Sequence, residues 1–237
     1  MGCNLISPND TANFLSFLRD LRTAVGQNFT ITAAAGITPW LSEDKTPVTN
    51  VSAFAEVLDY VAIMNYDVWG LSDGIVGPNS PLDETCAPPP NLSHGSAVSA
   101  VRAWTNAGMP PDKIVLGVAY YGRLFRVSNE NAAGPNGSLA LYPPFDEKNQ
   151  PVGDDGAPLP DDKDVCGVPV TKPGGIIQFS GMITKFLDED GEPLPEKKFA
   201  FDGCSKTVRI PIQIEMHNLI WLTALRIRSN QRYHGFL

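Results

Sequence analysis

The sequence predicts an α/β fold built on a parallel sheet, and two observations lead to this prediction. Helical and strand patterns alternate along residues 9–126, and the strand patterns are continuous apolar runs. Continuous apolar strands are typical of a sheet that is buried on both faces. Strand–helix–strand alternation predicts parallel strands that are joined by right-handed crossovers.

The elements follow in order from Asn9. Apolar residues at helical spacing from Phe14 to Val25, followed by Gly26, predict an amphipathic helix. The sequence then predicts a strand over residues 29–37, a weaker helix over 51–58, a strand over 60–64, a helix over 95–108 and a strand over 113–123.

After Arg126 the alternation stops. Residues 128–173 are rich in turn signals, and KPGGIIQFSGMI predicts another strand or a short helix, so this region is interpreted as an inserted subdomain. Residues 208–237 differ again, because they contain no Lys and no Asp. Three interpretations stay open for them: an amphipathic closing helix around 214–228, sequence foreign to the fold, or a weak basic membrane anchor.

Composition limits the classes of ligand. The net charge of −8 argues against nucleic acid and anionic membranes, which require a basic surface, and favours a neutral ligand. There is no apolar stretch long enough to span a membrane, and the start does not resemble a signal peptide. The dispersed His and Cys residues and the absence of nucleotide-binding loops predict neither a metal nor a cofactor.

Cysteines and glycosylation motifs favour a secreted ancestry. The four cysteines are far apart, which allows two disulfides, and five N-x-S/T motifs are suited to a glycosylated protein. These motifs begin at Asn9, Asn28, Asn50, Asn91 and Asn136.

Polar and aromatic residues follow the strand in YVAIMNYDVWG. Tyr66, Asp67 and Trp69 come directly after the apolar run, at the carboxyl edge where ligands bind in α/β folds. VAYYGR places Tyr121 and Arg123 at a second strand end, so these groups are expected to converge. Hydrogen-bonding groups flanked by aromatic rings are suited to a sugar.

A competing motif is GLSDG at residues 70–74, which matches the nucleophile elbow of serine hydrolases. An elbow requires a helix directly after the serine. Gly77, Pro78 and Pro81 occupy that region, so we interpret the match as a product of a Gly/Ser-rich loop.

Four motifs occur in one order along the chain: ITAAAG, MNYDVWG, GVAYYGRLF and PGGIIQFSGMI. Together they resemble the chitinases of glycoside hydrolase family 18, particularly the fungal secreted type. The resemblance implies a (β/α)8 (TIM) barrel with an inserted α+β subdomain, of which this chain would hold roughly the second half, truncated at both ends. Residues 1–127 would form a partial barrel containing its fifth to seventh strands, 128–203 the inserted subdomain, and 204–237 a segment that does not match the family.

The resemblance also implies roles for individual residues. The family hydrolyses chitin by a substrate-assisted retaining mechanism, in which a glutamic acid protonates the glycosidic oxygen and the N-acetyl carbonyl of the sugar attacks. Tyr66 would hydrogen-bond that carbonyl and Asp67 would bind the sugar beside it. Contacts with substrate would also come from Met64, Trp69, Tyr121 and Arg123, with Trp69 the weaker candidate.

One departure from the family bears directly on activity. The acid belongs to a D-x-x-D-x-D-x-E motif, and that motif does not occur in these 237 residues. Loss of a general acid typically lowers the rate by about 10² to 10⁴, so we expect the chain alone to be inactive. An incomplete parallel sheet would also leave an apolar face unburied. The alternative is a fragment that binds chitin without catalysis.

The resemblance leads to four further expectations. The ligands would be chitin or N-acetylglucosamine oligomers, the chain a monomer, and its location extracellular although no signal peptide is seen. Expected disulfides are Cys166–Cys204 and Cys3–Cys86.

Overall fold

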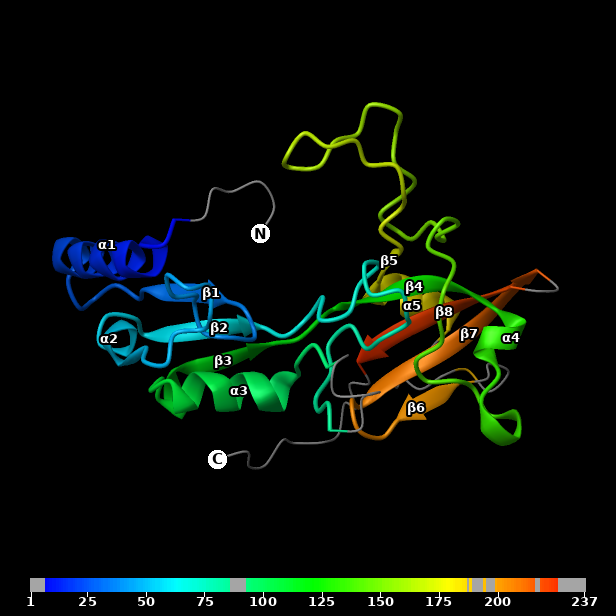
Figure 1. The fold of residues 1–237 in the computed structure, drawn as a ribbon, viewed down its shortest axis with the longest axis horizontal. Coiled ribbons are helices and arrows are strands. Elements are labelled where there is room, and N and C mark those ends of the chain that lie inside the picture. The colour runs from blue at the N-terminus through cyan, green and yellow to red at the C-terminus, as the bar shows by residue number, and fades with distance from the viewer. Residues whose placement is uncertain are drawn as a thin grey trace. The chain divides into compact units, whose positions relative to one another are not determined.

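The computed structural model describes residues 7–85, 93–186, 188, 194, 199–215 and 218–225, and it describes their side chains except at 183, 212–215 and 218–225. The described residues fall into two compact units, and Figure 1 labels their elements. Unit 1 holds the chain up to Asn65 together with Gly95–Val118. Unit 2 holds Tyr66–His94 together with the chain from Ala119 onward.

The elements of unit 1 are α1 (Asp10–Val25), β1 (Thr32–Ala35), α2 (Ser52–Ala55), β2 (Tyr60–Met64), α3 (Ala97–Asn106), η2 (Pro111–Lys113) and β3 (Ile114–Gly117). The elements of unit 2 are β4 (Tyr121–Ser128), α4 (Asn129–Ala132), η3 (Pro135–Gly137), β5 (Ile176–Gln178), α5 (Phe179–Lys185), β6 (Ala200–Asp202), β7 (Thr207–Glu215) and β8 (Asn218–Leu225).

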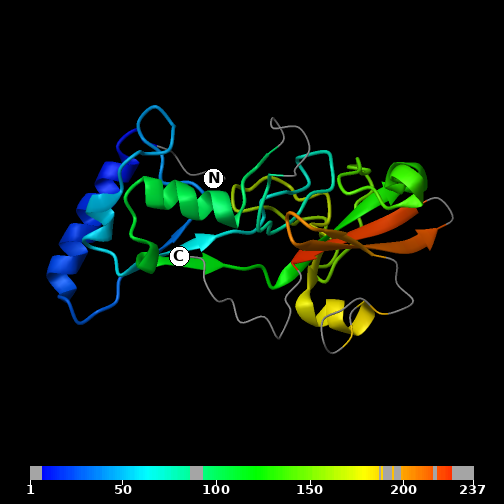
Figure 2. The same cartoon turned by 90° about the horizontal axis from the view of Figure 1, so that it is seen from below.

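Unit 1 is a three-stranded parallel sheet in the order β1-β2-β3, which confirms the predicted strand direction. Its core joins one face of the sheet, including Val61 and Ile63, to apolar residues of all three helices. Trp104 of α3 is fully buried in this core. Figures 1 and 2 both show α3 alongside β3.

The opposite face of the same sheet keeps apolar side chains exposed. The parallel register places Tyr60, Met64 and Val115 on this face, and all three are exposed. Parallel sheets are normally buried on both faces, so this face has the character of a core surface.

Arg22, in the last turn of α1, forms hydrogen bonds with the segments that precede β1 and β2. Its guanidinium donates to the carbonyls of Val57, Gly26 and Phe29 and forms an ion pair with Asp59 at 2.7 Å. The same Asp59 oxygen accepts the backbone N–H of Ile31 at 2.7 Å, at the start of β1.

These hydrogen bonds predict an acid sensitivity of unit 1. The backbone N–H of Ile31 and then the Arg22 guanidinium lower the pKa of Asp59. A carboxylate whose pKa is lower in the folded state stabilises that state above its unfolded pKa of about 4, and this stabilisation is lost as the pH falls through the folded-state pKa. Thermal unfolding should therefore shift to lower temperature below about pH 4, and the shift should be smaller in Asp59→Asn. Asp20→Asn, an exposed change on α1, is the control; equal acid shifts in both variants would contradict the prediction.

Unit 2 is built on an antiparallel five-stranded sheet in the order β5-β4-β8-β7-β6. Successive side chains of β4 pack on opposite faces of this sheet. Leu124 packs with Met182 and Phe186 of the α5 region, whereas Phe125 packs with Val76 and other residues in a second cluster. This alternation follows from the two-residue period of a strand.

The single strand predicted over residues 113–123 is wrong. β3 ends at Gly117 in the parallel sheet, and β4 begins at Tyr121 in the antiparallel sheet of unit 2. Antiparallel pairing with β5 and β8 fixes β4 in the second sheet. Tyr121 and Arg123 therefore lie within a strand, not at the carboxyl end of a parallel one.

The closing helix expected around residues 214–228 is also wrong for the part that is described, because β7 and β8 form a hairpin there. The sequence contains a strand pattern here, because Val208, Ile210, Ile212 and Ile214 occupy every second position. β4 to β8 form one sheet. This sheet takes strands from all three predicted segments, residues 1–127, 128–203 and 204–237. Those boundaries stay a prediction.

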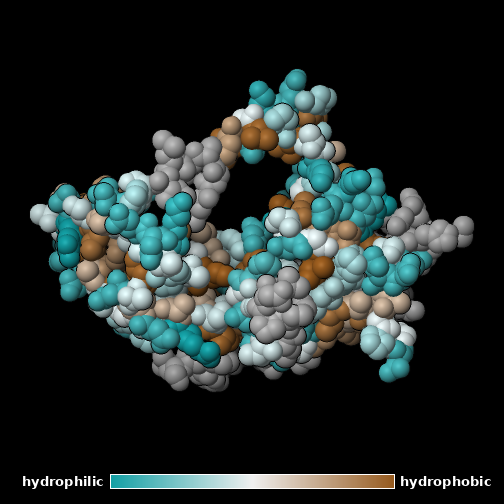
Figure 3. Space-filling model, viewed as in Figure 1, coloured by the Kyte–Doolittle hydropathy of each residue, from teal (hydrophilic) through white to brown (hydrophobic). Residues whose placement is uncertain are grey.

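A segment around residues 156–172 extends from the rest of unit 2 (Figure 1). Within it, an antiparallel bridge joins Lys163 to Pro169, and Leu159, Val165 and Val168 are exposed. Apolar residues are visible on this segment in Figure 3.

The cysteines agree only in part with expectation. Cys204 is disulfide-bonded, but Cys166 takes no part in that bond, so the expected Cys166–Cys204 pairing is wrong. The expected Cys3–Cys86 bond lies outside the described residues. Among the described helices, none has the length and apolarity that crossing a membrane requires.

Candidate functional site

The centre of the site is the carboxylate of Asp67, which follows β2 in the chain and belongs to unit 2. Tyr121 Oη donates a hydrogen bond to Asp67 Oδ1 at 2.7 Å. Arg123 donates to the same oxygen from Nε at 3.2 Å and from Nη2 at 2.5 Å. Three donors on one oxygen fix the orientation of this carboxylate.

β4 supplies both partners of Asp67. Tyr121 and Arg123 are two residues apart on the strand, so their side chains project from the same face. Arg123 Nη1 also donates to the Gly174 carbonyl at 3.3 Å, which braces the guanidinium from the turn before β5. The sequence predicted that these residues would converge with Asp67, and the structure brings them together.

Asn79 holds the backbone of Asp67 in place, and the sequence did not reveal this role. Its Oδ1 accepts the N–H of Asp67 at 3.1 Å, and its Nδ2 donates to the Tyr121 carbonyl at 3.4 Å. Asp67 has φ of +55°, a backbone conformation uncommon for residues other than glycine and costly without such support. The only sequence signal was the length of the loop between Asp67 and His94; Asn79 itself resembles an ordinary turn residue.

Tyr66 completes the cluster. Its ring lies edge-to-face with the Tyr121 ring, with 6.3 Å between centroids. Within the described part of the chain, no protein hydrogen bond is found for the Tyr66 hydroxyl or for Asp67 Oδ2, and the Asp67 side chain is half exposed. The site therefore combines an anchored carboxylate oxygen with a second one that can accept and a phenol that can donate.

The other two expected substrate contacts, Trp69 and Met64, have different outcomes. Trp69 is only 2% exposed, is packed against His94 and Tyr142, and has Gly77 so close that a Cβ there would lie 2.2 Å from its ring. A buried indole has no open face for a sugar, so the expected stacking role of Trp69 is withdrawn. Met64 is exposed on the sheet of unit 1, and its role in binding stays a prediction.

The phenol of Tyr121 should ionise at a higher pH than an ordinary tyrosine. Burial, and then the hydrogen bond to Asp67, raise the pKa of Tyr121 well above its usual value, because both penalise the phenolate. Wild type and Tyr121→Phe should therefore show the same rise in tyrosinate absorbance between about pH 9 and pH 11, where ordinary tyrosines titrate. A rise that is smaller by one tyrosine in Tyr121→Phe would contradict the hydrogen-bonded, partly buried phenol.

Neither a metal-binding cluster nor a nucleophile elbow is present among the described residues. They contain no group of three or more His, Cys, Asp or Glu side chains placed to hold a metal ion. From Gly70 to Thr85 they form turns and bends and not the helix that a nucleophile elbow requires.

The site therefore brings together a half-exposed carboxylate, a guanidinium and two phenols on an α/β scaffold. The model of glycosyl hydrolases family 18 matches residues 3–200. The chain belongs to this family, as the sequence motifs indicated.

Similar proteins carry chitinase names. A "chitinase-like effector" of Moniliophthora roreri is 50% identical over 87% of this chain, and one of Moniliophthora perniciosa is 47% identical over 86% of it. The chain spans about half the length of these relatives, 50% and 46% respectively. A solved chitinase of Rhizomucor miehei has a TM-score of 0.75 and 27% identity, with 94% of this chain and 57% of that chain covered.

The solved relatives are chitinases of the TIM-barrel fold, whereas the sheets described here form no closed barrel.

Proposed function

We propose that this chain recognises N-acetylglucosamine units of chitin or its oligomers through Tyr66, Asp67, Tyr121 and Arg123. The observation that carries the proposal is the state of the Asp67 carboxylate: Oδ1 is held by Tyr121 and Arg123, and Oδ2 is open beside the Tyr66 phenol. An acetamide presents one carbonyl acceptor and one N–H donor. The Tyr66 hydroxyl and Asp67 Oδ2 are complementary to these two groups.

The comparisons support the same ligand class. A solved class V chitinase from Nicotiana tobaccum is in complex with NAG4, and the relatives named above carry chitinase names. We infer further that β1, β2 and β3 are the fifth, sixth and seventh strands of a (β/α)8 barrel, with parallel order and similarity to part of a chitinase as support. Extracellular location belongs to the same proposal, with the five glycosylation motifs as its support.

We propose in addition that residues 1–237 bind without hydrolysing. Among the described residues, the cluster offers no general acid: burial and the hydrogen bond to Asp67 raise the pKa of Tyr121, and Asp67 Oδ1 accepts hydrogen bonds from Tyr121 and Arg123. The acidic family motif that would supply a glutamic acid does not occur in the sequence.

Calorimetric titration with N-acetylglucosamine tetramer and glucosamine tetramer tests recognition. The acetylated tetramer should bind at least about tenfold more tightly, because only it offers the acetamide groups; tenfold corresponds to about 1.4 kcal/mol. Tyr66→Phe, which keeps the ring contact with Tyr121, should reduce this preference. Equal affinity for the two tetramers, or no binding, would contradict the proposal.

Chromatography of the same incubations tests catalysis. Release of disaccharide should not exceed that of a double variant Tyr66→Phe, Asp67→Asn. Product release above this control would contradict the non-hydrolytic part of the proposal and leave recognition intact.

A further inference from the structure

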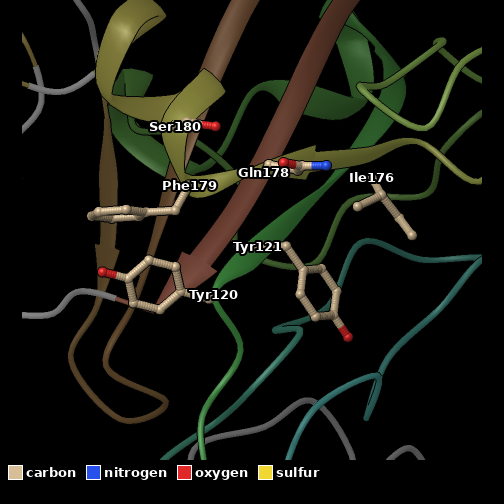
Figure 4. Close-up of a pocket in the computed structure, with 6 residues that line it drawn as sticks. All are labelled: Tyr120, Tyr121, Ile176, Gln178, Phe179 and Ser180. Carbon is tan, nitrogen blue, oxygen red and sulfur yellow. The ribbon is translucent and has the colours of Figure 1, made fainter.

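An exposed aromatic ring in unit 1 is not explained by the candidate site. Phe29 is 64% exposed, as is Tyr120 in unit 2. Tyr120 lines a pocket together with Tyr121 (Figure 4), and Tyr121 is part of the Asp67 cluster, so the candidate site accounts for its exposure. Phe29 instead lies in the turn between α1 and β1, in the middle of a glycosylation motif that begins at Asn28. A sugar is suited to both features, because sugars are attached at this motif and pack on aromatic rings.

Arg22 fixes the backbone of this turn. Its Nη1 donates to the carbonyls of Gly26 at 3.1 Å and of Phe29 at 2.6 Å, on either side of Asn28. Asn28, Phe29 and Thr30 are all exposed. The fold therefore presents the three residues of the motif to solvent on an anchored turn.

The two groups that define the motif are both available here. They are the amide of the asparagine, which receives the sugar, and the hydroxyl two residues later. Among the described residues, no protein hydrogen bond is found for the side-chain amide of Asn28 or for the Thr30 hydroxyl. Neither group has to break a contact of the fold to take part in glycosylation.

Two other described motifs use their hydroxyl within the protein. The Thr11 hydroxyl donates to the Leu41 carbonyl at 2.5 Å. The Ser138 hydroxyl donates to the Pro135 carbonyl at 2.7 Å. In both motifs the group that glycosylation requires is already engaged.

The motif at Asn50 is held at the start of α2. Asn50 Oδ1 accepts the backbone N–H of Ser52 at 2.9 Å, and Val51 between them is fully buried. The motif at Asn91 lies outside the described residues. Of the four motifs that the structure describes, the one at Asn28 is thus the one with its amide and its hydroxyl both free and all three residues exposed.

The attachment is a group transfer that requires no oxidant or reductant. Asn28 Nδ2 forms a bond to the anomeric carbon of an N-acetylglucosamine unit that is carried, with the rest of its oligosaccharide, on a polyprenyl diphosphate. The bond between this carbon and the diphosphate oxygen breaks. The lipid diphosphate leaves with the bonding electron pair, and Nδ2 loses one proton.

We propose that Asn28 is an N-glycosylation site and that the first sugar of its glycan packs on Phe29. The inference rests on the extracellular location in the proposed function, because this modification occurs in secreted proteins. Phe29 follows Asn28 directly, and an N-acetylglucosamine ring has an apolar C–H face that matches an aromatic ring. The glycan thus covers an apolar side chain that the fold leaves open.

Mass spectrometry of the full chain, secreted from a eukaryotic host behind a secretion leader, tests the site. The tryptic peptide from Thr23 to Lys45 contains the Asn28 motif and no other. This peptide should carry an oligosaccharide in the wild type and in Thr30→Ser, and none in Asn28→Gln or Thr30→Ala. Asn13→Gln is the control, because Asn13 is exposed and precedes a phenylalanine but has no hydroxyl residue two positions later. It should leave the peptide modified.

Stepwise trimming of the glycan tests the contact with Phe29. A glycosidase that leaves the first N-acetylglucosamine should not change the thermal unfolding midpoint. An amidase that removes this sugar as well should lower the midpoint by about 2–4 °C, the shift expected for loss of one contact in a chain of this length. The drop should be smaller in Phe29→Ala, in which the amidase converts Asn28 to aspartate in the same way. Equal drops in both proteins would contradict the contact.

Binding of N-acetylglucosamine tetramer to the same secreted protein separates this inference from the proposed function. An unmodified peptide in the wild type refutes the glycosylation site, whether or not the tetramer binds. A modified peptide in a protein that does not bind the tetramer supports the site and refutes recognition of the oligomer.

Discussion

Asp67→Ala is expected to weaken binding of N-acetylglucosamine tetramer by about 10- to 100-fold. The change removes an oxygen that is open to the ligand and the acceptor that holds Tyr121 and Arg123 in place. Hydrogen bonds to charged groups contribute about 1.5–3 kcal/mol, which corresponds to this range of affinity. Calorimetric titration of the purified variant measures the effect.

Asp161→Ala is the matched control for this prediction. It removes an equally short acidic side chain, also in unit 2, from the exposed segment around residues 156–172. The control should bind like the wild type. An Asp67→Ala protein that keeps full affinity and a normal unfolding curve would show that the carboxylate is not part of the binding site.

Trp104→Ala should have the largest effect on stability, with a loss of about 3–5 kcal/mol from the free energy of unfolding of unit 1. The indole is fully buried between the helices and the sheet, and its Nε1 donates to the Gly36 carbonyl at 3.0 Å. It also lies edge-to-face with Trp40 at 4.8 Å. The variant leaves a cavity and a carbonyl without its donor.

Urea unfolding followed by far-ultraviolet circular dichroism measures this loss. Phe17→Ala on α1 is the control, because its ring is 57% exposed and its removal leaves no cavity. The control should lose less than about 0.5 kcal/mol, as is usual for surface changes. A similar, small loss in both variants would contradict a core centred on Trp104.

The parallel sheet was predictable from local pattern alone. β2 is a short, continuous apolar run, and β1 is a threonine followed by three alanines. Residues such as Val61 and Ile63 favour strands at any position along the chain. The same pattern placed Tyr66 and Asp67 after the end of β2, which the structure confirms. Local propensity and tertiary environment agree in this part of the chain.

Other features depended on contacts between distant residues. The step from β3 to β4 could not be predicted from GVAYYGR, because it arises from pairing of Tyr121 with Gln178 across the intervening loops. The burial of Trp69 depends on the close approach of Gly77 and could not be inferred from the position of Trp69 after a strand.

The strand β7 was predictable in principle. Its residues alternate with a period of two, but the interpretation as a helix began at residue 214 and so left out the alternation from Val208. The role of Asn79 had no comparable signal, since an asparagine in a Gly/Pro-rich loop is typical of any turn.

Saturation-transfer NMR on N-acetylglucosamine tetramer tests recognition of the acetamide by the Asp67 cluster, because it reports which ligand protons contact the protein. The acetamide methyl protons of one sugar should receive the strongest saturation from the wild type. This signal should fall sharply in Asp67→Ala and persist in Asp161→Ala. Uniform or absent saturation in the wild type, or an unchanged acetamide signal in Asp67→Ala, would contradict recognition of the acetamide by this cluster.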